Sequence, residues 1–251
     1  MKLFTGDKLM KMFFTVALGL SLTTAFAHDK TYWGEKVNVG EGYARSYIVK
    51  GHDKEVKEIG IAISEEGLNG LPDEMKEYTL PMPANTEVYP YKHITFDWNP
   101  HGHEPMGVYD KPHFDIHFYF ITEEERHAIS CMDEDTIPCL MQPDADYLVS
   151  DYAPTPAGVP MMGWHWVDLL SPEFNGGIFT RTFIYGYYGG ETIFIEPMVT
   201  IDYLLSKEES TLPIRQPAKF PYDGYYPKNY QVKYDDCMKM YKVVLKDFYE
   251  Q

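Results

Sequence analysis

Ionisable and apolar side chains alternate in one short stretch of this sequence. In His113-Phe114-Asp115-Ile116-His117-Phe118-Tyr119-Phe120, every second residue is ionisable or carries a hydroxyl, and the others are aromatic or aliphatic. Because successive side chains of a β-strand point to opposite faces, His113, Asp115 and His117 would share one face. Imidazole and carboxylate ligands suit Zn, Mn, Fe, Cu or Ni, whereas Ca and Mg call for more oxygen ligands. The stretch predicts a transition-metal site of open metal identity, and a hydrogen-bonded polar network or a solvated face is the alternative.

Spacing along a strand limits which of these side chains can share an ion. Residues two apart lie about 6.6 Å apart at Cα, so Asp115 can share an ion with either histidine. His113 and His117 lie about 13 Å apart and can do so only if the rings converge or the strand bulges. At least one ligand must therefore come from elsewhere. The candidates are His103, which forms an H-x-H pair with His101 in the preceding loop, His165 in Trp164-His165-Trp166, and Glu196 at the end of an apolar strand.

Each candidate also has a purely structural interpretation. His165 could be packed between its two tryptophans, Glu196 could hydrogen-bond a nearby loop, and Asp115 could orient a ligating histidine without touching the ion. Patterns of other active sites do not occur: the sequence has no G-x-S-x-G, no G-x-x-x-x-G-K-[ST], no H-E-x-x-H and no C-x-x-C. The chemistry therefore depends on the histidines and carboxylates.

The elements that must position these residues are mostly strands. Tyrosine, β-branched residues, glycine and proline are spread along the chain, and long amphipathic helical patterns are scarce. We predict a mainly β fold, an antiparallel β-sandwich or barrel-like single domain over residues 28–251, with one or two short helices and long Pro-rich loops. The predicted strands are 47–50, 59–64, 77–80, 91–98, 113–120, 178–187, 191–195, 231–235 and 240–245. A helical turn is predicted over 65–71, a helix capped by Thr122 to about residue 130, either strand or helix over 198–205, and loops over 99–112, 131–160 and 212–227.

The N-terminus has the layout of a secretory signal peptide over residues 1–27. Lysines precede an apolar run from Met12 to Leu22, and Ala25-Phe26-Ala27 provides an A-x-A cleavage site. The run is too short to span a membrane, so we expect a periplasmic or extracellular protein without membrane insertion after cleavage. The formal net charge of −16 argues against nucleic acid and anionic membranes as partners.

Three cysteines are present, at positions 131, 139 and 237. In an oxidising compartment Cys131 and Cys139 could close a small disulfide ring and leave Cys237 unpaired. The alternative is that one or all of them are free thiols.

Two blocks, Pro100-His101-Gly102-His103-Glu104-Pro105-Met106-Gly107-Val108-Tyr109 and Pro112 to Tyr119, resemble an uncharacterised family of exported bacterial proteins. Its structural prototype is a thermophile protein controlled by an extracytoplasmic-function sigma factor and its anti-sigma factor. The resemblance implies a β-rich fold, a homo-oligomer and no established activity. It also implies six matching site positions: His103, His113, Asp115, His117, His165 and Glu196.

These observations leave three functions open. The first is an exported metal-binding β-protein that acts as a metal-dependent hydrolase or oxidoreductase. The second is a non-catalytic protein of envelope stress that binds metal or a small molecule, and the third is a structural oligomer with a histidine-rich core. Three protein ligands beside a pocket would favour the first, and a closed site of four protein ligands would favour the others.

Overall fold

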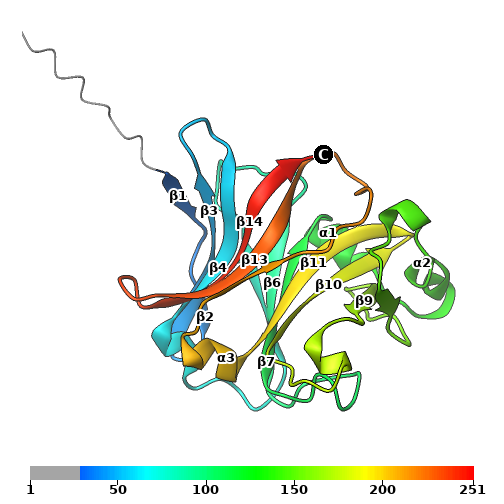
Figure 1. Cartoon of the computed structure of the whole chain (residues 1–251), viewed down its shortest axis with the longest axis horizontal. Helices are drawn as coiled ribbons and strands as arrows, with labels where there is room; N and C mark the ends of the chain where they lie inside the picture. The colour runs from blue at the N-terminus through cyan, green and yellow to red at the C-terminus, as the bar shows by residue number, and fades with distance from the viewer. Residues whose placement is uncertain (1–28) are drawn as a thin grey trace, which may run out of the picture.

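Two antiparallel sheets face each other across a shared apolar core in the computed structural model of the chain (Figure 1). The structure describes residues 29–251, so the predicted signal peptide, residues 1–27, lies outside the described part. The prediction of a mainly β fold is confirmed, and of the two architectures that the sequence left open the arrangement is the sandwich.

Sheet A contains the N-terminal strands and the C-terminal hairpin. The strands predicted over 231–235 and 240–245 form this hairpin, and both run further from its turn than expected. The order is β1 (Lys30–Trp33), β3 (Gly42–Lys50), β4 (Val56–Ser64), β14 (Met240–Glu250), β13 (Tyr225–Asp235) and β12 (Ser210–Pro213), with β2 (Val37–Val39) paired to β3.

Sheet B carries the residues that the sequence singles out. The strand predicted over 113–120 is β7, and it lies near the middle of this sheet. The order is β5 (Lys76–Pro81), β6 (His93–Asn99), β7 (His113–Tyr119), β11 (Glu191–Thr200), β10 (Arg181–Tyr188), β9 (Trp164–Asp168) and β8 (Tyr152–Pro154). Figure 1 shows β7, β11, β10 and β9 side by side, although β9 comes 45 residues after β7 ends.

The core forms where alternating apolar side chains of the two sheets meet. From β7, Phe114, Ile116 and Phe118 are fully buried there, and Ile61 and Val243 contribute from sheet A. Burying one such side chain stabilises the fold by about 1.5 to 3 kcal/mol. This burial requires the other face of β7, with its histidines and aspartate, to point away from sheet A.

Helices and loops complete the chain, and several expectations need correction. Residues 29–251 contain three short α-helices rather than one or two: α1 (Glu123–Ala128), α2 (Thr136–Cys139) and α3 (Ile201–Ser206). The Thr122 capping box of α1 is confirmed, with Glu125 as its partner. The segment 131–160 is not one loop, because it includes α2 and β8. The segment 198–205 is both strand and helix, because Thr200 ends β11 and caps α3.

None of the helices within residues 29–251 is long and apolar enough to cross a membrane. The Cys131–Cys139 disulfide is confirmed, with the two Cα atoms 5.3 Å apart, and Cys237 is an exposed free thiol. A disulfide is compatible with an oxidising compartment.

Candidate metal centre

The face of sheet B that points away from sheet A is polar and buried. On β6 and β7 the polar residues pair across the strands: Thr95 with His117, Asp97 with Asp115, and Asn99 with His113. None of these six side chains belongs to an exposed residue, because loops and small apolar clusters cover this face. Burying so many polar groups is costly unless they find partners.

The first group, which we call the His113 group, consists of His103, His113 and Asp115. The Nε2 atom of His103 lies 3.2 Å from Oδ2 of Asp115, and Nε2 of His113 lies 3.1 Å from Oδ1. Asn99 donates a hydrogen bond of 2.7 Å to Oδ2 of the same carboxylate. Both carboxylate oxygens of Asp115 are thus directed at imidazoles.

A tight turn brings His103 from the loop over the sheet. His103 forms an isolated β-bridge with Tyr109, which folds the loop back on itself. The preceding residue, Gly102, has a φ of +70°, and a Cβ atom there would lie 2.1 Å from the carbonyl oxygen of Tyr109. Glycine is therefore required at position 102 for His103 to reach the site.

The second group, which we call the His117 group, consists of His117, His165 and Glu196. The register of β11 on β7 places Glu196 opposite His117, and β9 brings His165 from the far side of β10. The Oε2 atom of Glu196 lies 3.4 Å from Nε2 of His117 and 3.8 Å from Nε2 of His165. In both groups the candidate ligand atoms lie within 4.8 Å of one another.

In three of the histidines the ring nitrogen that points away from the carboxylate of its group, Nδ1, contacts a neighbouring oxygen. Nδ1 of His103 lies 2.7 Å from the carbonyl oxygen of Glu104, and Nδ1 of His113 lies 2.6 Å from that of Lys111. Nδ1 of His117 lies 3.2 Å from the hydroxyl of Thr95 and 3.4 Å from Oδ2 of Asp97. Because a carbonyl oxygen only accepts, Nδ1 must carry the proton in His103 and His113. The Nε2 atom that faces the carboxylate then has a free lone pair when the ring is neutral.

Burial governs the protonation of the His117 group. It lowers the pKa of His117 well below the usual range and lowers the pKa of His165 to about 4. Burial, reinforced by the negative charges of Asp115 and Asp97, raises the pKa of Glu196. Both histidines are therefore neutral near pH 7, as metal coordination requires.

The His113 group has a different balance. Burial alone would raise the pKa of Asp115, but the positive charge of His113 and the hydrogen bond from His103 hold this pKa well below its usual range. Burial alone would lower the pKa of His103, and the hydrogen bond to Asp115 raises it instead. Asp115 is therefore an ionised carboxylate that needs a positive partner.

Several buried polar atoms at the two groups lack a hydrogen-bond partner among the described residues. They include Nε2 of His117 and Oε2 of Glu196, which face each other, and both carboxylate oxygens of Asp97. Such atoms are rare in folded proteins, and an ion is one of the explanations for them.

A cavity of about 630 Å³ lies beside these groups. Five of the six predicted site residues line it, and His113 is not among the lining residues. The segment 155–159 and Met162 form one wall, and the loop from His103 to Tyr109 contributes another.

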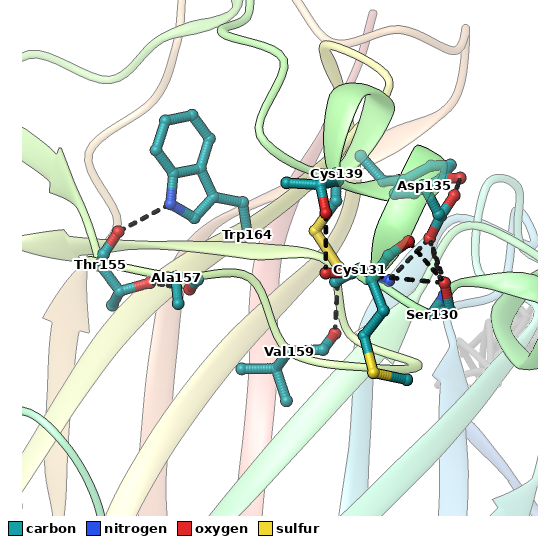
Figure 2. Close-up of a disulfide and its surroundings, with 11 residues drawn as sticks. Ser130, Cys131, Asp135, Cys139, Thr155, Ala157, Val159 and Trp164 are labelled. Carbon is teal, nitrogen blue, oxygen red and sulfur yellow. Dashed lines mark hydrogen bonds between the residues drawn. A yellow bond between two sulfur atoms is a disulfide. The ribbon is translucent and has the colours of Figure 1, made fainter.

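The disulfide supports the wall formed by 155–159 (Figure 2). Gly158 lies so close to it that a Cβ atom would be 2.1 Å from the sulfur of Cys139. On the other side, Thr155 accepts a hydrogen bond of 2.7 Å from the indole of Trp164, in the strand that carries His165. The wall is thus held between the disulfide and β9.

The structure brings together all six residues that the sequence predicts, but as two groups of three. His113 and His117 lie in different groups, in agreement with the spacing argument. His165 is not packed between its tryptophans, because Trp164 and Trp166 contact each other on the opposite face of the strand. His101 lies away from both groups and contacts Asp73.

Sequence reasoning missed Asp97, which lines the cavity and contacts His117. A signal was present: β6 alternates as strictly as β7, with His93, Thr95, Asp97 and Asn99 on one face and apolar residues on the other. Two neighbouring strands with the same polar alternation indicate a shared polar face.

The fold and the site together define a two-sheet β-sandwich protein with two buried groups of histidine and carboxylate side chains beside a cavity. Residues 51–98 match the family model TTHB210-like, described as "Hypothetical protein TTHB210", a domain of unknown function. The matched stretch ends in β6 and includes Thr95 and Asp97, but none of the six predicted site residues. No curated protein and no solved structure matches the chain. The link to a sigma factor and the homo-oligomer stay predictions.

Proposed function

We propose that this protein is an exported metal-dependent enzyme whose transition metal is bound by His117, His165 and Glu196. The observation that carries the proposal is the pair of unpartnered buried atoms, Nε2 of His117 and Oε2 of Glu196, with the second imidazole directed at the same carboxylate oxygen. Lone pairs that face each other in a buried site repel unless a proton or a cation lies between them.

The distances in the His117 group support a metal ion. In a tetrahedral zinc site with bonds of about 2.0 to 2.2 Å, two ligand atoms lie about 3.3 to 3.6 Å apart. The two distances to Oε2 of Glu196, 3.4 and 3.8 Å, are close to this range. The hydroxyl of Thr95, 3.2 Å from Nδ1 of His117, and the carboxyl group of Asp97, 3.4 Å from it, lie where a metal-ligating histidine usually has its outer hydrogen-bond partner.

Three protein ligands leave coordination positions for water or substrate, and the cavity lies beside them. Two histidines and one carboxylate occur in zinc hydrolases, where the metal activates water, and in iron oxygenases, where it activates oxygen. We therefore propose a hydrolase or an oxidoreductase, with Zn, Mn, Fe, Cu or Ni as the metal. A protein that only stores metal has no need of such a cavity, which favours an enzyme.

The His113 group is a candidate for a second ion. Like the His117 group, it consists of two imidazoles and one carboxylate, and the Nε2 atoms of both its histidines are directed at Asp115. Because both oxygens of Asp115 are directed into this group, the two groups would bind separate ions rather than share a bridging carboxylate. Asp115 of one group and His117 of the other are two residues apart on β7, which places their Cα atoms about 6.6 Å apart.

Two observations support export. The N-terminal sequence has the pattern of a cleaved signal peptide, and the Cys131–Cys139 disulfide is stable in oxidising compartments.

The test is metal analysis of protein expressed without a polyhistidine tag and exported to the periplasm. We expect bound transition metal, and loss of one equivalent per chain in a His117→Ala/His165→Ala double variant. His127→Ala is the matched control, because His127 is exposed and belongs to neither group, and this variant should keep its metal.

Circular dichroism must show that the double variant is folded, and Glu196→Gln, nearly the same shape as glutamate, gives a second variant. The proposal is wrong if the unaltered protein neither carries a transition metal nor binds one on titration. It is equally wrong if folded variants bind as much metal as the control.

A further inference from the structure

The surface of the cavity beside the His117 group is mostly apolar, although many of its lining residues have polar or ionisable side chains. The apolar side chains that form its walls include Met75, Pro105, Val159, Met162, Val167 and Ile184. Its volume, about 630 Å³, is within the range of about 300 to 1,000 Å³ that is typical of small-molecule sites. Because Met75 and Val159 are 64% and 38% exposed, the cavity reaches the protein surface.

The charged groups of the cavity are all acidic or imidazole. Four carboxylates line it, those of Asp97, Glu104, Asp115 and Glu196, and no Lys or Arg does so among residues 29–251. A buried cation nearby, Arg126, is bonded to both carboxylate oxygens of Glu77. A phosphate or carboxylate substrate would therefore find neither Lys nor Arg, and the ionised carboxylate of Asp115 would repel it.

The polar groups of the cavity are grouped rather than dispersed. Two imidazoles and three of the carboxylates lie on the face of sheet B, and the imidazole of His103 lies next to it. The wall formed by residues 155–159 and Met162 has mostly apolar side chains. A sugar or nucleotide needs hydrogen-bond partners along its whole length, and burying its hydroxyls against these walls would cost free energy. An apolar molecule with a polar group at one end fits this distribution.

We infer that the substrate is a neutral, mainly apolar small molecule that presents one metal-coordinating group, such as a hydroxyl or carbonyl, to the ion at the His117 group. This inference rests on the proposed function and names the substrate class of the same site. The apolar part packs against the wall formed by residues 155–159 and Met162, and binding is driven by removal of apolar surface from water.

A series of alkyl hydroxamates on cobalt-loaded protein tests the inference, because the head group chelates the metal and only the tail varies. The visible absorption of cobalt reports both metal binding and ligand binding. Each methylene that enters an apolar site contributes about 0.8 kcal/mol, so we expect Kd to fall about fourfold per methylene from acetohydroxamate to octanohydroxamate.

Val159→Asp should abolish most of this gain and leave acetohydroxamate binding unchanged. Val159 lines the cavity and is partly exposed, so the variant should fold. Ile178→Asp is the matched control, because Ile178 is 66% exposed and lies outside the cavity lining, and it should retain the full dependence on chain length.

Two failures are distinguishable. If cobalt produces no site spectrum, the proposed metal site is wrong, and a metal-coordinating substrate is excluded with it. If cobalt binds but acetohydroxamate and octanohydroxamate bind equally, or Val159→Asp leaves the series unchanged, the substrate inference alone is overturned.

Discussion

At the scale of single residues, the site is defined by the hydrogen bonds behind its imidazoles. His103 and His113 bond carbonyl oxygens through Nδ1, and Nδ1 of His117 bonds the hydroxyl of Thr95 and lies 3.4 Å from the carboxyl group of Asp97. For His103 and His113 the carbonyl contact fixes the proton on Nδ1, and in all three histidines Nε2 is turned toward a carboxylate. A simple polar network would not need Nε2 of all three histidines to face a carboxylate, whereas metal binding needs the other ring nitrogen to be oriented in this way.

Asp97→Asn tests this orientation at His117. The change keeps the shape of the side chain but removes the carboxylate that lies 3.4 Å from Nδ1. Loss of such an outer partner typically weakens metal affinity about 10- to 100-fold, and we expect a change of this size in cobalt titrations. Asp53→Asn, at an exposed position of sheet A's β3–β4 turn, is the control. An unchanged Kd for Asp97→Asn would mean that Asp97 does not orient His117.

The sequence allowed prediction of single residues where a local pattern carries the information. Alternation on β7 predicted that His113, Asp115 and His117 share a face, and the same reasoning applied to β6 would have found Asp97. Which partner each residue meets was beyond the sequence. His165 and Glu196 reach His117 through the register of three strand pairings, and register depends on contacts between distant segments.

At the scale of elements, the order β7-β11-β10-β9 assembles the His117 group, and two loops enclose the cavity beside it. Residues 131–160 were expected to be a loop of little regularity, and α2 and β8 lie within it. The cause is visible in the structure: the disulfide and Asp135, which accepts hydrogen bonds of 2.7 Å from the backbone N–H groups of Ser130 and Cys131, impose local order (Figure 2). Such constraints leave no periodic signal in the sequence.

Removal of the disulfide should weaken both stability and ligand binding. For Cys131→Ser/Cys139→Ser, the short loop that the bridge closes predicts a loss of about 2 to 3 kcal/mol in the free energy of unfolding, measured with urea. Because Gly158 packs on the bridge, this variant should also lose affinity for octanohydroxamate, and it should lose less or none for acetohydroxamate. Cys237→Ser, at the exposed free thiol, should change neither quantity. Unaltered octanohydroxamate affinity in the double variant would show that the wall does not depend on the disulfide.

At the scale of the whole molecule, the two faces of sheet B have different tasks. One face packs against sheet A in a large apolar core, and the other buries two groups of ionisable side chains. Burying Asp115 and the His117 group opposes folding, and the core must offset this cost. A bound cation would remove much of the cost, because it partners the carboxylates and the imidazole lone pairs. Metal binding and folding stability should therefore be coupled in this protein.

Metal removal should lower the melting temperature of the folded protein. A ligand at 100 times its Kd stabilises the native state by about 2.7 kcal/mol. A shift of about 2 to 4 °C per kcal/mol is typical of a domain of this size. We therefore expect the melting temperature to fall by about 5 to 10 °C when a chelator removes the metal.

The double variant His117→Ala/His165→Ala separates the two groups in the same measurement. Its melting temperature should respond to the chelator less than that of the unaltered protein, because the His117 group can no longer bind an ion. A response that remains in the double variant and disappears on adding His103→Ala would belong to the His113 group. An ion that coordinates the buried nitrogen and oxygen atoms without hydrogen-bond partners must favour the native state. Equal melting temperatures of the unaltered protein with metal and with chelator would therefore contradict the coupling.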